Sequence, residues 1–79
     1  MKAKVIITLK NGVLDPQGKA IEGALTSLGF SGVDNVRQGK FIELDIAAEN
    51  ADEAHATVEA MCEKLLSNTV IENYRVEVE

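Results

Sequence analysis

The chain has 79 residues, and its 13 acidic against 8 basic side chains give a net charge of −5. This length has room for one domain, residues 1–79, because independent domains usually have roughly 100 residues. The single cysteine excludes an intramolecular disulfide, and the acidic balance disfavours nucleic acid and anionic membranes as partners. We find no apolar run long enough for a signal peptide or a membrane span, and we expect a cytoplasmic protein.

The first two elements are predicted from a change of periodicity. Residues 2–10 alternate at every step, which is typical of a strand with one buried face, and Asn11-Gly12 closes it. Asp15 and Pro16 suit the N-cap and first position of a helix, and Gly29 suits its end. The apolar stripe of this helix consists of Ala20, Ile21, Ala24, Leu25 and Leu28.

Two further strands are expected in the middle of the chain. They cover residues 33–37 and 41–48 and are joined by Gln38-Gly39-Lys40, unless the whole segment is one long bent strand. In the second of them the inward side chains are Ile42, Leu44 and Ile46.

A second helix and a last strand complete the chain. Asn50 with Glu53 three residues later resembles a capping box, and Ser67-Asn68 ends the helix. The helix has the stripe Ala54, Val58, Met61, Cys62, Leu65 and Leu66. Residues 70–79 form a strand with Val70, Tyr74, Val76 and Val78 on one side.

The order β-α-β-β-α-β predicts an α+β fold, a ferredoxin-like two-layer sandwich. In it, two helices cover one face of a four-stranded antiparallel sheet. The other face stays open and carries two large apolar side chains, Ile6 and Phe41, among charges of both signs. It is either an ordinary solvated face or a surface for self-association, and the small core favours association.

No catalytic, cofactor-binding or metal-binding residue is predicted. The lone imidazole, His55, and the lone thiol, Cys62, lie seven positions apart on one helix, about 10 Å along its axis, and cannot form a dyad. Cys62 is expected to be a buried, inert thiol. The strand-to-helix junction with Gly12 and Gly18 is too sparse in glycine for a phosphate loop. The chain thus resembles a binding or scaffolding module.

Three segments, in order, resemble one family over essentially the whole chain. They are Leu14-Asp15-Pro16-Gln17-Gly18, then Val36-Arg37-Gln38-Gly39-Lys40 with Glu43-Leu44, and finally residues 62–74. Together they are similar to the PurS family, the small subunit of phosphoribosylformylglycinamidine synthase.

The resemblance implies a subunit without catalytic residues that bridges two enzymes. PurQ, a glutaminase, releases ammonia, and PurL, a synthetase that binds ATP and Mg, uses it to make formylglycinamidine ribonucleotide in purine biosynthesis. The resemblance also implies homodimers and pairs of dimers.

Partner contacts are expected at three places: the start of the first helix at residues 15–18, the connection of residues 37–40, and the segment of residues 68–74. The candidates are Asp15, Gln17, Arg37, Lys40, Asn68 and Glu72, with Ile6 and Phe41 for self-association. Each residue has a local alternative, such as Asp15 as a helix cap. The alternative function is an ACT-like regulatory module that binds a small molecule, with Asn11-Gly12 as a weak match to its loop.

Overall fold

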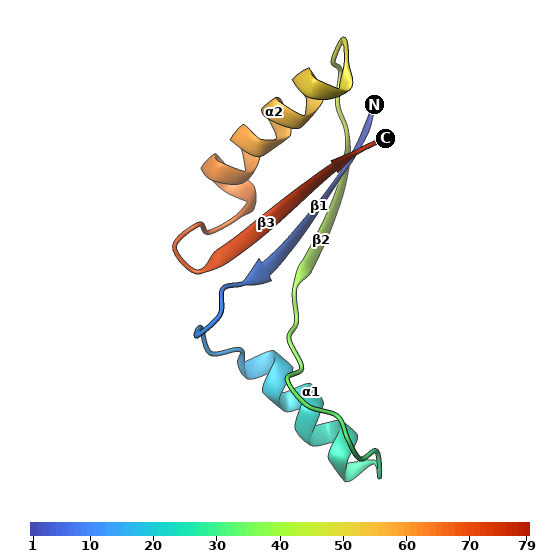
Figure 1. The fold of residues 1–79 in the computed structure, drawn as a ribbon, viewed down its shortest axis with the longest axis vertical. Helices are drawn as coiled ribbons and strands as arrows, with labels where there is room; N and C mark the ends of the chain where they lie inside the picture. The colour runs from blue at the N-terminus through green and yellow to red at the C-terminus, as the bar shows by residue number, and fades with distance from the viewer.

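The computed structural model describes all residues, 1–79, and contains a three-stranded sheet and two α-helices (Figure 1). The elements in chain order are β1 (Lys2–Leu9), α1 (Pro16–Ser27), β2 (Lys40–Asp45), α2 (Ala51–Met61), the π-helical turn η1 (Cys62–Leu66) and β3 (Glu72–Val78). The described chain is elongated, with extents of 50 × 24 × 15 Å.

The sheet has the strand order β2-β1-β3, and both pairs are antiparallel. Val5 in the central strand lies opposite Ile42 of β2 and Val76 of β3, so that the three side chains share one face. The alternation predicted for β1 is therefore confirmed. The inward positions Ile42 and Leu44 of β2 are half-buried, because no helix lies directly over this strand.

The core is small and lies between α2 and the inner face of β1 and β3. Its fully buried members are Ala3, Val5, Ile7, Ala54, Val58 and Cys62, with Val76 nearly so. Burial of each Val or Ile stabilises the fold by about 1.5 to 3 kcal/mol. Cys62 is thus a buried thiol, as expected, and burial raises its pKa.

α2 begins at the predicted N-cap, where the side chain of Asn50 accepts a hydrogen bond from the backbone N–H of Glu53 at 2.8 Å. The helical run ends at Ser67, as predicted, but its last turn, η1, has i→i+5 bonding, with the N–H of Ser67 donating to the carbonyl of Cys62. The wider turn shifts later residues off the 3.6-residue period. Leu66 therefore packs against the core, whereas Leu65 is 83% exposed.

The strand predicted over residues 33–37 does not form, and the sheet has three strands rather than four. Two backbone donors at the end of this segment and just after it are bound by the side chains of Glu22 and Asp15. The N–H of Val36 donates to the carboxylate of Glu22, and the N–H of Gln38 donates to Asp15. Asn35 has a positive φ of 53°, which also interrupts an extended strand.

The prediction that both helices cover the sheet is wrong for α1. The helix has the predicted N-cap and ends before Gly29, which has a positive φ of 94°. It points away from the end of the sheet, at the opposite end of the molecule from α2 (Figure 1). Its stripe residues Ile21 and Leu28 are consequently exposed.

Smaller differences concern the ends of two strands. β2 ends at Asp45 instead of continuing to residue 48, and β3 begins at Glu72. Val70 therefore precedes the strand and is exposed, whereas Tyr74 and Val78 pack against the core as predicted.

Candidate partner-binding site

Asp15 joins the start of α1 to the chain that enters β2. Its Oδ1 accepts a hydrogen bond from the N–H of Gly18 at 2.8 Å, and its Oδ2 accepts one from the N–H of Gln38 at 2.7 Å. Both hydrogen bonds lower the pKa of the Asp15 carboxyl, and the bond from Gln38 has the larger effect. Asp15 is only 5% exposed. It therefore fixes the local backbone and offers no free oxygen to a partner.

Arg37 closes the same region from the other side. Its guanidinium donates to the carbonyl of Val13 at 3.0 Å and to that of Lys10 at 3.1 Å. The side chain thus ties the connection after β1 to the connection before β2. Arg37 therefore has a structural role in the region where a partner contact was expected.

Close backbone packing completes the base of α1. Gly18 is buried, and a Cβ atom built on it would overlap the carbonyl oxygen of Val36 and lie 2.9 Å from Oδ2 of Asp15. Only glycine fits against the returning chain at this position.

Lys40 and Glu72 form an ion pair across the end of the sheet. The Nζ of Lys40 lies 3.3 Å from the carboxylate of Glu72, whose side chain is largely buried. The same carboxylate accepts a hydrogen bond from the N–H of Asn68 at 2.6 Å. The hydrogen bond from Asn68 lowers the pKa of the Glu72 carboxyl most, and the positive charge of Lys40 lowers it further. Asn68 acts as a turn residue, since its carbonyl also accepts from Ile71 and Glu72.

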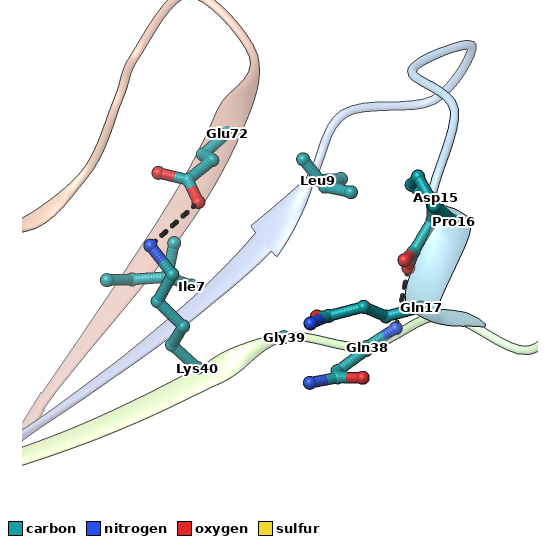
Figure 2. Close-up of a pocket in the computed structure, with 9 residues that line it drawn as sticks. All are labelled: Ile7, Leu9, Asp15, Pro16, Gln17, Gln38, Gly39, Lys40 and Glu72. Carbon is teal, nitrogen blue, oxygen red and sulfur yellow. Dashed lines mark hydrogen bonds and ion pairs between the residues drawn. The ribbon is translucent and has the colours of Figure 1, made fainter. Parts of the chain in front are cut away.

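These residues surround a groove of about 410 Å³ between the end of the sheet and the start of α1, which we call the junction groove. Figure 2 shows Gln17, Gln38 and Lys40 around it, with the Asp15–Gln38 and Lys40–Glu72 interactions dashed. Its lining residues are Ile7, Leu9, Asp15, Pro16, Gln17, Gln38, Gly39, Lys40 and Glu72.

Four of the six predicted partner-contact residues line the junction groove, namely Asp15, Gln17, Lys40 and Glu72. Arg37 and Asn68 lie behind it and support its walls. Sequence reasoning missed Gln38, although it stood between two selected residues, because it was read as part of a tight strand connection. The exposed polar side chains Gln17, Gln38 and Lys40 can donate hydrogen bonds to a protein surface.

Ile6 and Phe41 lie directly opposite each other on β1 and β2, on the outer face of the sheet. Phe41 is 56% exposed and Ile6 is half-buried. Ion pairs border them on this face, between Lys4 and Glu79 and between Lys2 and Glu43. Self-association through this pair stays a prediction.

The remaining chemistry-bearing groups do not converge. His55 pairs with Glu59 one turn along α2, with 3.1 Å between Nδ1 and Oε1. No group of three or more His, Cys, Asp or Glu side chains is arranged to hold a metal ion. None of the helices has the length and apolar character needed to span a membrane.

Comparison with known proteins identifies the family. The family model of PurS, phosphoribosylformylglycinamidine (FGAM) synthase, matches residues 2–79. The PurS subunit of this synthase from Bacillus subtilis is 53% identical over 78 residues, which cover 99% of this chain and 92% of the relative. The PurS subunit from Methanocaldococcus jannaschii is 47% identical over 78 residues, with 99% and 94% covered.

Solved structures agree over nearly the whole length. The crystal structure of PurS from Methanocaldococcus jannaschii matches with a TM-score of 0.88 and 49% identity, and the match covers 99% of this chain and 94% of that one. A chain of the PurLQS structure from Thermotoga maritima matches with a TM-score of 0.88 and 37% identity, over 96% and 93% of the two chains. This chain therefore belongs to the PurS family, the PurS subunit of phosphoribosylformylglycinamidine synthase.

Proposed function

We propose that this chain is the non-catalytic bridging subunit of the synthase, a ligase, and that it holds a PurL synthetase and a PurQ glutaminase together. The observation that carries this proposal is the near full-length match to a chain of the PurLQS structure from Thermotoga maritima. The family assignment also leaves the ACT-like alternative without support.

The bridging role has a physical reason in the reaction. PurQ releases ammonia from glutamine, and PurL uses it, with ATP and Mg held by PurL, to convert formylglycinamide ribonucleotide to the amidine. Ammonia that enters bulk water is protonated and loses its nucleophilic lone pair. A subunit that keeps the two enzymes in register shortens the transfer path and limits the water along it. We place the complex in the cytoplasm, because its substrates are soluble metabolites.

The junction groove is the proposed contact for one of the two enzymes. Gln17, Gln38 and Lys40 supply exposed donors, and the apolar side chains of Leu9 and Pro16 border them. Such a mixture of apolar surface and oriented polar groups is typical of specific protein interfaces. Asp15, Arg37, Asn68 and Glu72 contribute by holding the groove in shape through inward bonds.

The Ile6–Phe41 pair is the proposed contact for self-association, either in a homodimer or between dimers. Phe41→Asp places a charge in the middle of this outer-face pair and is expected to lower the sedimentation coefficient of the purified chain. An unchanged coefficient would count against this face.

The test of the bridging role is reconstitution with PurL and PurQ of the same organism. Amidine formation from glutamine, ATP and Mg is measured with and without the chain, and ammonia replaces glutamine in parallel. We expect the chain to raise the glutamine-dependent rate and leave the ammonia-dependent rate unchanged. Equal glutamine-dependent rates in both tubes would refute the bridging role.

Two matched charge reversals test the junction groove. Lys40→Glu reverses the charge of a cross-strand Lys–Glu pair at the groove, whereas Lys2→Glu reverses that of the Lys2–Glu43 pair at the other end of the sheet. We expect Lys40→Glu to weaken co-sedimentation with PurL or PurQ and Lys2→Glu to leave it unchanged. Equal effects of the two variants would exclude the groove as the contact.

A further inference from the structure

The connection between β1 and α1 contains a tight turn with Asn11 and Gly12 at its centre. The N–H of Val13 donates to the carbonyl of Lys10 at 3.2 Å, which closes the turn. Gly12 has a positive φ of 85°, a conformation that glycine adopts without strain, so the turn itself favours a glycine directly after Asn11. The side chain of Asn11 is exposed, and it takes no part in lining the junction groove.

The backbone nitrogen of Gly12 is open to reaction. Its N–H donates to no backbone carbonyl, and a Cβ atom built on Gly12 would meet nothing within 4 Å. Gly12 also borders a hollow of about 300 Å³, whose charged lining residues are Lys19, Arg37 and Asp15. Because positive charge predominates there, the hollow favours the deprotonated, nucleophilic form of a nearby amide.

The chain has four other asparagines, and each of them is more restrained. They are Asn35, Asn50, Asn68 and Asn73. The side chains of Asn50 and Asn68 accept hydrogen bonds from backbone N–H groups. Asn35 precedes Val36, whose N–H is bound by a carboxylate, and Asn73 lies within β3. Only Asn11 is followed by a glycine.

We propose that Asn11-Gly12 is a site of spontaneous deamidation, at which Asn11 is converted to a mixture of aspartate and isoaspartate. Hydroxide or a buffer base removes the N–H proton of Gly12, and the nitrogen attacks Cγ of Asn11. The amide nitrogen of the side chain takes up a proton and leaves as ammonia, and a five-membered succinimide remains. Water then opens the ring. Cleavage of the bond from the nitrogen to Cγ gives aspartate, whereas cleavage of its bond to the backbone carbonyl carbon gives isoaspartate. One water is consumed and one ammonia is released, without oxidation or reduction.

The isoaspartate product would lie inside the clasp that Arg37 forms. The guanidinium of Arg37 donates to the carbonyl of Lys10 at 3.1 Å and to that of Val13 at 3.0 Å, on either side of Asn11-Gly12. In isoaspartate the main chain runs through Cβ, which lengthens the path between these two carbonyls. The planar guanidinium presents its donors at a fixed spacing and cannot follow this change. Isoaspartate therefore costs Arg37 at least one hydrogen bond, whereas aspartate keeps the original path.

Ageing of the purified full-length chain tests the chemistry, and the result does not depend on the bridging role. Peptide mass mapping measures how fast each asparagine side chain changes from an amide to an acid at neutral and at mildly alkaline pH. Asn68 is the internal control, because it is also exposed but precedes a β-branched residue. We expect Asn11 to react about ten or more times faster than Asn68 and faster at the higher pH, since the attacking nitrogen must lose its proton.

Two further measurements identify the product and the mechanism. An enzyme that methylates only isoaspartate carboxylates should label the peptide that contains Asn11. Asn11→Gln should stay unmodified, because its side chain would have to close a six-membered ring. Equal reaction rates at Asn11 and Asn68, or aspartate as the sole product, would overturn the proposal.

Urea unfolding of the separated products at one protein concentration tests the effect on the clasp. We expect the isoaspartate form to have an unfolding equilibrium constant about tenfold higher than the fresh chain, as for the loss of a hydrogen bond from a charged donor. Asn11→Asp, which adds the charge without the longer path, should change it little. In an Arg37→Ala chain the clasp is already absent, so isoaspartate should add almost nothing. Equal destabilisation with and without Arg37 would refute the effect on the clasp.

Discussion

Gly18 and Gly23 lie in the same helix, but Gly18 packs against the returning chain and Gly23 faces open space. Alanine variants at the two positions can therefore measure the energetic cost of crowding the base of α1. Alanine in place of a helical glycine normally stabilises by about 0.5 to 1 kcal/mol. This gain applies to both positions. At Gly23 a Cβ atom meets open space, whereas at Gly18 it would overlap the backbone carbonyl of Val36. The difference between the two variants therefore isolates the cost of overpacking, about 1 to 3 kcal/mol.

The amide proton of Gln38 reports this cost directly, because it is bound by Asp15 only while the returning chain stays against α1. A loss of about 1 to 3 kcal/mol corresponds to exchange with solvent that is about 5 to 150 times faster. We expect the amide of Gln38 to exchange faster by this factor in Gly18→Ala than in Gly23→Ala, measured by NMR at one protein concentration. Equal protection of Gln38 in the two variants would refute the packing argument.

Three further predictions concern acid, the core and the thiol. The pKa of Asp15 is lowered by its bonds to Gln38 and Gly18, so its contribution to stability is present above pH of about 3.9 and is lost as the pH falls through the lowered value. In an NMR titration, the chemical shifts of the Gly18 and Gln38 amides should change in that acidic range. The Asp15→Asn variant should not show this change. Val58→Ala removes two buried methyl groups and should lower the free energy of unfolding in urea by about 2 to 3 kcal/mol, whereas a change near zero would mean that α2 is not packed on the sheet. Cys62 is fully buried with a raised pKa, and it should react with a thiol reagent only as fast as the chain unfolds; immediate labelling of the native chain would contradict its burial.

Local signals predicted the elements of this fold well. The N-caps predicted at Asp15 and Asn50 both form, because an N-cap depends on residues only three positions away. Alternation along β1 is reliable for a similar reason, since one face of a central strand must be buried.

The place of α1 could not be predicted from its pattern. An apolar stripe indicates that a helix face is covered, but it carries no information on whether the cover comes from the same chain. The missing strand over residues 33–37 has a different cause, because Glu22 and Asp15 lie 14 and 23 positions away from the backbone donors that they bind. Such pairings depend on tertiary structure and leave no periodic signal.

Only part of the candidate site was predicted from the sequence. Gln17, Lys40 and Glu72 were selected as surface residues of the connections, and the fold brings them to one groove. The internal role of Arg37 was not foreseen, since an arginine that binds two carbonyls has no sequence signature.

The tie between Asp15 and Gln38 closes residues 16–37 into a hairpin-like arm whose two ends leave the sheet region side by side. The register between β1 and β2 therefore does not depend on the length of this arm. Insertion of one full helical turn after Gly23 would extend the arm by about 5.4 Å and leave the pairing of β1 with β2 intact. The architecture thus separates the reach of the subunit from the stability of its core, and protein engineering can adjust the first without redesigning the second.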